Sequence, residues 1–161
     1  DVAPAATQPL SELATTGLVP FRAVIRAGAP AVMVSNASVP GLTSQPSSLS
    51  PAVIGGLLRQ QLGFHGLVIT DSLSAGAVLT GGRTLPQAAV AAIGAGADLV
   101  LFGSTLTPDD TAQLSAPNVQ RSYSQIVNGI TEAVSDGHLP IARLTAAATT
   151  VAGAAHDHLC P

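Results

Sequence analysis

Three short runs of consecutive apolar residues, each followed by a polar loop, constrain the fold of this chain most strongly. They occupy residues 31–34 (AVMV), 66–70 (GLVIT) and 98–102 (DLVLF). Continuous apolar runs of this length are typical of strands that are buried on both faces, as parallel strands are. Helix-like spacing separates the runs, and alternating strands and helices predict a parallel sheet with right-handed crossovers. The sequence therefore predicts an α/β fold with three parallel strands.

Capping and stop signals set the expected helix limits. The first helix is expected to begin at Pro20 and to end at Gly28, because proline tolerates the first helical turn and glycine ends helices. Ser50 is expected to be the N-cap of a second helix that Gly63 ends, and Thr84 the N-cap of a third. Two further helices are expected over residues 119–135 and 141–155, the first of them preceded by a cap-like Thr-Pro-Asp-Asp at 107–110.

The predicted sheet is too small to be an ordinary complete one. Three strands cannot close a barrel, so the chain is either a compact three-layer domain or part of something larger. Charged residues make up only 9% of the chain, against about 25% in typical domains. A surface that contacts a partner segment is apolar, so the low charge favours the second alternative. We expect residues 1–161 to form one partial domain, because no linker divides them.

Composition excludes several classes of function. The net charge is −3, with six Arg, no Lys and no basic patch, so a nucleic-acid partner is not expected. A phosphate-binding P-loop is excluded because it needs a lysine. No run approaches the roughly 20 apolar residues that span a bilayer, and the given N-terminus has no signal-peptide pattern. The single cysteine, Cys160, is expected to be a free thiol, and His156-Asp157-His158 is expected to be solvated rather than metal-binding.

Asp71 is the strongest candidate for a functional residue. Functional groups in parallel α/β folds collect in the loops at the carboxyl ends of strands. These loops begin here at Ser35-Asn36, Asp71 and Gly103-Ser104, and only Asp71 is ionisable. A carboxylate at that place can serve as nucleophile, base or metal ligand, but it can equally cap the turn. Asp98 precedes its strand, at the opposite end, and is expected to be structural.

Four motifs in order carry a resemblance to a known family. They are LSP at 49–51, LLR-x-x-LGF-x-G at 57–66, ITDSL at 69–73 and AGADLVL at 95–101. Together they resemble glycoside hydrolase family 3, and within it the bacterial β-N-acetylglucosaminidases. The resemblance implies a (β/α)₈ TIM-type barrel in which the three strands are the sixth to the eighth. This chain would then be the C-terminal portion of that barrel, incomplete without a missing N-terminal half.

The resemblance also implies a reaction. Asp71 matches the family's nucleophile, which attacks the anomeric carbon of a terminal β-linked N-acetylglucosamine. The product is a covalent glycosyl-aspartate, whose hydrolysis gives net retention. The acid/base is a histidine on a loop that would precede residue 1, so the isolated chain is expected to be inactive. Asn36 stands where relatives often have histidine and is expected to hydrogen-bond a sugar hydroxyl, while Ala75 replaces a common methionine.

The resemblance implies a carbohydrate substrate and neither a metal nor an organic cofactor. Cell-wall-type glycosides and peptidoglycan recycling are the expected context. A bacterial source is expected, with the full-length protein in the cell envelope, as a lipoprotein, or in the cytoplasm. The rival hypothesis is a non-catalytic sugar-binding or assembly module on a degenerate barrel, with Asp71 as a turn cap. A small flavodoxin-like domain is a third alternative that three strands and no phosphate loop disfavour.

Overall fold

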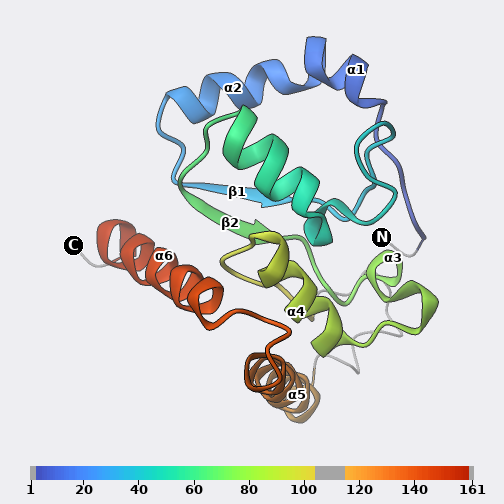
Figure 1. Cartoon of the computed structure of the whole chain (residues 1–161), viewed down its shortest axis with the longest axis vertical. Helices are drawn as coiled ribbons and strands as arrows, with labels where there is room; N and C mark the ends of the chain where they lie inside the picture. The colour runs from blue at the N-terminus through green and yellow to red at the C-terminus, as the bar shows by residue number, and fades with distance from the viewer. Residues whose placement is uncertain (1–2, 104–114, 160–161) are drawn as a thin grey trace.

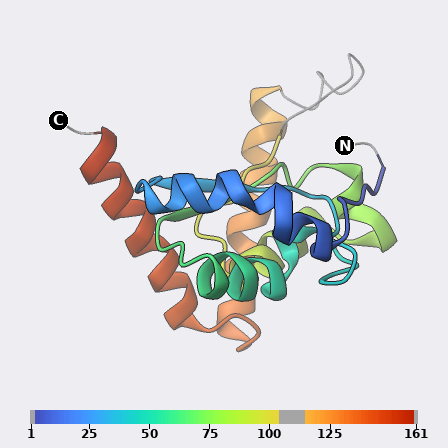
Figure 2. The same ribbon diagram turned by 90° about the horizontal axis from the view of Figure 1, so that it is seen from above.

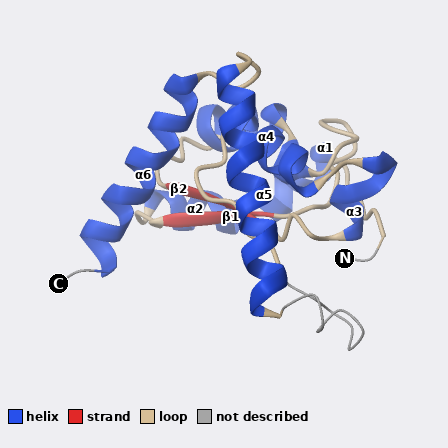
Figure 3. Cartoon of the chain, turned by 90° about the horizontal axis from the view of Figure 1, so that it is seen from below, coloured by secondary structure: helices blue, strands red, loops and turns tan. Residues whose placement is uncertain are grey.

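A small parallel sheet lies at the centre of the computed structural model, which describes residues 3–103 and 115–159 (Figure 1). Strand β1 (Ala31–Val34) pairs with β2 (Leu67–Thr70) in parallel, from Ala31 opposite Leu67 to Val34 opposite Thr70. Helices make up most of the rest, as Figure 3 shows. The predicted α/β class and the first two strands are confirmed. No closed barrel is formed by the described residues.

The third predicted strand is wrong in its extent. Residues 98–102 run beside β2, but only one parallel bridge forms, between Ile69 and Leu99. Two side chains interrupt the ladder after it. The Leu101 N–H donates to the hydroxyl of Thr70 (3.0 Å), and the Ser72 N–H donates to Oδ1 of Asp71 (2.7 Å). Regular pairing would use the Thr70 carbonyl as the acceptor for Leu101 and the Leu101 carbonyl as the acceptor for Ser72.

Only one face of the sheet is covered, although the sequence predicted burial on both. Val34, Val68 and Thr70 lie buried in the core beneath the helices. The opposite face carries Met33 and Leu99, whose exposed fractions are 55% and 41%. The strands are apolar on both faces because their sequence is that of a sheet covered on both sides, and the described chain covers one side.

The N-terminal helix is longer than predicted. It consists of α1 (Leu10–Glu12), a π-helical turn η1 (Leu13–Gly17) and α2 (Leu18–Arg26) without a break. The expected start at Pro20 is wrong. A proline inside a regular helix collides with the carbonyl four residues earlier, and here that residue, Thr16, lies in the widened π turn. Gly28 follows the helix with a φ of 84°, so the predicted end is confirmed.

The second predicted helix is present as η3 (Ala52–Gln61), which has π-type hydrogen bonding, and a 3₁₀ turn η2 (Ser47–Leu49) precedes it. The prediction of Ser50 as a side-chain cap is wrong. Ser50 instead offers its backbone carbonyl to the N–H groups of Val53 and Ile54. The end at Gly63 is confirmed, with a φ of 69°.

The third predicted helix is confirmed as α4 (Leu85–Ala95), which a capping box of Thr84 and Gln87 begins and Gly96 ends. Gly96 has a φ of 116°, and a Cβ there would lie 2.9 Å from Ile54. The preceding loop contains two elements that the sequence did not predict, α3 (Gly76–Leu79) and η4 (Thr80–Gly82). They place Ala77 and Val78 in the core.

Two long helices complete the described chain, α5 (Ala116–Ser135) and α6 (Ile141–Leu159), as predicted. In the view of Figure 1, α2 and η3 are drawn higher in the picture than the two strands and α4, α5 and α6 lower; these are positions in the projection and not the two faces of the sheet. Seen from above in Figure 2, α6 stands at the opposite side of the molecule from the N-terminal segment. The predicted cap at 107–110 lies outside the described residues.

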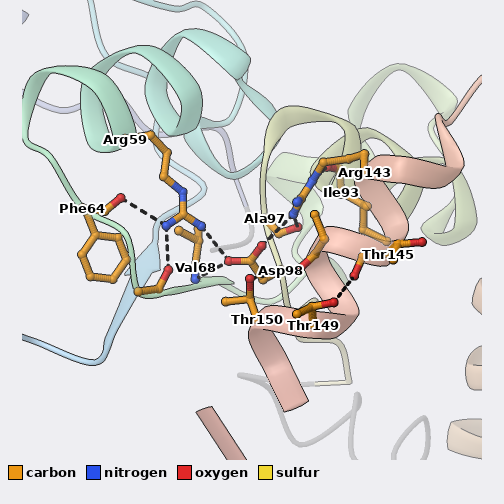
Figure 4. Close-up of polar contacts among 12 residues, drawn as sticks. Arg59, Phe64, Val68, Ile93, Ala97, Asp98, Arg143, Thr145, Thr149 and Thr150 are labelled. Carbon is orange, nitrogen blue, oxygen red and sulfur yellow. Dashed lines mark hydrogen bonds and ion pairs between the residues drawn. The ribbon is translucent and has the colours of Figure 1, made fainter. Parts of the chain in front are cut away.

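A buried carboxylate joins the elements at the amino end of β2 (Figure 4). Asp98, with a side chain only 1% exposed, forms ion pairs with Arg59 of η3 and Arg143 of α6, both at 2.7 Å. Its Oδ2 also accepts from the Val68 N–H at 3.0 Å. The guanidinium groups continue the network to backbone carbonyls, of Phe64 and Gly66 for Arg59 and of Ile93 and Ala97 for Arg143. The predicted structural role of Asp98 agrees with these contacts.

We predict that Asp98→Asn destabilises the protein by about 3–5 kcal/mol, because it leaves two partly buried guanidinium groups without their counter-charge. Urea unfolding followed by circular dichroism measures the loss. Asp136→Asn, at an exposed position in the turn before α6, is the matched control and should change stability by less than about 0.5 kcal/mol. Equal losses in both variants would contradict this account of Asp98.

Candidate functional site

The loops that follow β1 and β2 meet at one edge of the sheet. Asp71 comes directly after β2, and its N–H donates to the carbonyl of Val34, the last residue of β1 (2.9 Å). Asn36 lies two residues beyond that end and donates from Nδ2 to the Ser72 carbonyl (2.8 Å). The two predicted site residues therefore belong to neighbouring, hydrogen-bonded segments. Parallel strands bring this about because their carboxyl ends lie on the same side.

The carboxylate of Asp71 is partly exposed and locally fixed. Its Oδ1 accepts a 2.7 Å hydrogen bond from the N–H of Ser72, the next residue. This bond takes the Ser72 amide out of the strand ladder, so the ladder stops where the carboxylate begins. The N–H of Leu73 takes the place of the Ser72 N–H and donates to the Leu101 carbonyl at 2.8 Å. A carboxylate held in this way can act as a nucleophile, a base or a ligand.

Asn36 is buried beneath the loops, with 3% of its surface exposed. Besides the bond to Ser72, its Oδ1 accepts from the Ser48 hydroxyl at 2.6 Å. Ser48 is itself fully buried at 0% exposure, and its N–H donates to the Ser35 carbonyl. The amide of Asn36 thus connects the loop after β1 with the loop after β2. Its predicted contact with a sugar stays a prediction.

Serine hydroxyls connect the third loop to the site. Oγ of Ser74 accepts from the Gly103 N–H (3.0 Å), and Oγ of Ser72 accepts from the Ser74 N–H (3.4 Å). Sequence reasoning missed the roles of Ser48, Ser72 and Ser74 in joining these loops. The available signal was the number of serines in these loops, because buried backbone groups need partners and short hydroxyl side chains can supply them. Ser104, Asp109 and Asp110 lie outside the described residues.

The histidines do not gather at this edge. His65 is exposed in the turn that enters β2, and His138 is exposed in the turn before α6. His156 is exposed on α6, while the side chains of Asp157 and His158, and all of Cys160, lie outside the described part of the structure. No group of three or more His, Cys, Asp or Glu in the described residues could hold a metal ion. No helix in this part of the chain is long and apolar enough to cross a membrane.

Comparison with known proteins gives a consistent set of relatives. A family model, glycosyl hydrolase family 3 N terminal domain, matches residues 2–154. A β-hexosaminidase of Stenotrophomonas maltophilia is 40% identical over 92 residues, which is 57% of this chain and 27% of the relative. The β-hexosaminidase LpqI of Mycobacterium bovis is 38% identical over 105 residues, which is 62% of this chain and 27% of the relative.

A solved structure shares the fold over almost the whole chain. The family 3 β-N-acetylglucosaminidase of Paenibacillus sp. aligns with a TM-score of 0.80 and 27% identity, over 97% of this chain and 28% of that one. The matched part of this chain therefore covers little more than a quarter of the length of these three relatives. The two-stranded sheet with its covering helices corresponds to a part of a larger protein in each of them.

Proposed function

The chain belongs to glycosyl hydrolase family 3, and on this premise we propose that it is the C-terminal portion of the catalytic barrel of a retaining β-N-acetylglucosaminidase. The observation that carries the proposal is the partly exposed carboxylate of Asp71. It lies at the carboxyl end of β2, where barrel enzymes place their catalytic groups, and the Ser72 N–H holds it. It also lies within the ITDSL segment that resembles the family's nucleophile motif.

The open face of the sheet supports the incomplete barrel. Met33, Leu99 and Leu101 expose 40–55% of their surfaces on that face. Within the described residues, β1 pairs with β2 alone, so its other edge is available for a further strand. In our proposal, an N-terminal half of the barrel from polypeptide beyond these 161 residues pairs with that edge and covers the apolar face. Large exposed apolar patches are typical of such contact surfaces.

Asp71 performs the first chemical step in this proposal. The bond from Ser72 to Oδ1 sets the rotation of the carboxylate and orients Oδ2 towards the sugar. Oδ2 attacks the anomeric carbon, the bond to the leaving oxygen breaks, and an acid protonates that oxygen. The residue that protonated the leaving oxygen then takes a proton from water. This water attacks the anomeric carbon of the glycosyl-aspartate, releases Asp71, and restores the β configuration by a second inversion.

The acid/base comes from outside this chain in our proposal. His65 lies at the amino end of β2, and Asp71 lies at the carboxyl end. His138 lies in the turn between α5 and α6. Neither histidine belongs to the loops that surround Asp71. A histidine on a loop of the N-terminal half would supply the proton.

Bacterial relatives named β-hexosaminidases support the choice of sugar. We propose a terminal β-linked N-acetylglucosamine of cell-wall-type glycosides as the substrate, in peptidoglycan recycling. The complete protein would act in the cell envelope, as a lipoprotein, or in the cytoplasm of a bacterium. Fractionation of cells that produce the tagged complete protein distinguishes the two compartments.

We predict that Asp71→Asn in the complete protein abolishes covalent trapping by a fluorinated N-acetylglucosaminide. Hydrolysis of an aryl N-acetylglucosaminide should fall by about 10⁴-fold or more, because the amide cannot replace the carboxylate as nucleophile. Mass spectrometry of the peptide that contains residue 71 detects the adduct. Asp136→Asn is the control and should be labelled like the unchanged protein, whereas undiminished labelling of Asp71→Asn would exclude Asp71 as the nucleophile.

We further predict that the purified 161-residue chain shows little or no hydrolysis of the same aryl glycoside, because it has the nucleophile without the acid/base. The complete protein, assayed in parallel, is the positive control, and circular dichroism reports whether the short chain is folded. Robust turnover by the short chain would show that the acid/base lies within it.

Asn36 keeps a second function open, that of a non-catalytic sugar-binding or assembly module. Asparagine stands at this position where resembling sequences often carry histidine. Its buried amide forms hydrogen bonds within the chain. Sugar binding by the complete protein without labelling of Asp71 would favour the module over the enzyme.

A further inference from the structure

A series of three hydrogen bonds leads from a buried serine to the carboxylate of Asp71. The Ser48 hydroxyl donates to Oδ1 of Asn36 (2.6 Å), Nδ2 of Asn36 donates to the Ser72 carbonyl (2.8 Å), and the Ser72 N–H donates to Oδ1 of Asp71 (2.7 Å). From this geometry we infer that Asn36 is a positioning residue, which orients the Asp71 carboxylate through Ser72. The inference rests on the proposed role of Asp71 as the nucleophile.

The residues of this series are buried, and their hydrogen bonds therefore depend on one another. Ser48, Asn36 and Ser72 are 0%, 3% and 4% exposed. A buried polar group that loses its partner destabilises the structure, since water does not replace the lost bond. Removal of one member therefore leaves its neighbours unsatisfied, and the three residues behave as a unit.

The strand ladder shows why this unit acts on Asp71 in particular. The Ser72 N–H has two competing acceptors, Oδ1 of Asp71 and the Leu101 carbonyl. The Leu101 carbonyl would be its acceptor in a regular parallel ladder. The structure has the first arrangement, and Leu73 donates to Leu101 instead. Because Asn36 holds the Ser72 carbonyl, it fixes the position of Ser72 that favours Asp71. Without this contact the Ser72 N–H is no longer held at Oδ1 of Asp71, Leu73 still occupies the Leu101 carbonyl, and the carboxylate loses the bond that sets its rotation.

The burial of Asn36 favours the positioning role over a direct contact with the sugar. Its oxygen accepts from Ser48, and its amide nitrogen donates to Ser72. Only 3% of the residue is exposed. The second amide N–H and the second lone pair of the oxygen remain for a sugar hydroxyl, but the burial of the residue restricts access to them. In this inference Asn36 acts on the reaction through Asp71, and the predicted direct contact with the substrate is the alternative that the test below distinguishes.

The test compares Asn36→Ala and Ser48→Ala with Ser47→Ala in the complete protein. Ser47 is the matched control because it is equally buried, at 3%, and its hydroxyl also donates one 2.6 Å bond, to the Ala37 carbonyl, which does not lead to Asp71. Two quantities are measured, the first-order rate constant for trapping of Asp71 by a fluorinated N-acetylglucosaminide and the inhibition constant of free N-acetylglucosamine.

We expect trapping to slow by about 10- to 100-fold in Asn36→Ala and less in Ser48→Ala, which retains the bond between Asn36 and Ser72. The inhibition constant should stay within about twofold, and Ser47→Ala should leave both quantities unchanged. Weaker inhibition with an unchanged trapping rate would assign Asn36 to sugar binding and overturn the inference. Equal slowing in all three variants would also overturn it, because it would indicate general loosening of the loop.

Amide hydrogen exchange at Ser72, followed by NMR, tests the positioning separately from the chemistry. Protection of this N–H should fall in Asn36→Ala and Ser48→Ala but not in Ser47→Ala. Unchanged protection in the first two overturns the inference even if Asp71 is labelled. If the unchanged protein is not labelled while protection falls as expected, the proposed function fails and the positioning of the carboxylate stands. Ser48→Ala, which removes a single hydroxyl, keeps the test decisive if Asn36→Ala does not fold.

Discussion

Asp98 accepts hydrogen bonds from two arginines and from a strand amide, and this arrangement places the elements of the fold relative to one another. Arg59 reaches it from η3 and Arg143 from α6, while Val68 belongs to β2. Removing three charges from water is costly, and good geometry with further hydrogen bonds is needed to offset the cost. Both guanidinium groups have such bonds to backbone carbonyls. The network therefore fixes the amino end of β2, the strand that presents Asp71 at its other end.

The sheet combines a covered face and an open face, and this asymmetry explains the unusual composition of the chain. Helices bury Val34 and Val68, whereas Met33 and Leu99 remain accessible on the opposite side. A free-standing domain would normally place polar residues there. The low charge of 9% and the apolar open face follow from a single cause if further polypeptide covers that face. The match to about a quarter of the larger β-hexosaminidase and β-N-acetylglucosaminidase compared above agrees with this explanation.

Local signals predicted the elements that depend on local chemistry. The Thr84 cap is confirmed, because a hydroxyl acceptor acts within one helical turn, and a left-handed glycine, Gly96, ends α4. Such signals could not predict hydrogen bonds between residues that are far apart in the sequence. The third strand ended early because the side chains of Thr70 and Asp71 took amides from the ladder. The bonds of Asn36 to Ser48 and Ser72 were not predicted, because these partners lie in two segments whose contact depends on the folded sheet. The position of Asp71 was predictable because strand ends alone determine it.

The composition of the site suggests a division of labour in the proposed enzyme. In the hydrogen-bonded series from Ser48 to Asp71, Asp71 is the ionisable group, and serine and asparagine supply the other hydrogen bonds. Neutral donors and acceptors fix geometry without adding a second charge whose titration would perturb a nucleophile. The group that transfers the proton must instead have a pKa near the working pH and must be able to reach the leaving oxygen. A rigid segment that holds the carboxylate and a separate loop that carries the acid/base satisfy both requirements. The buried, hydrogen-bonded loops of this chain have the features expected of the rigid segment.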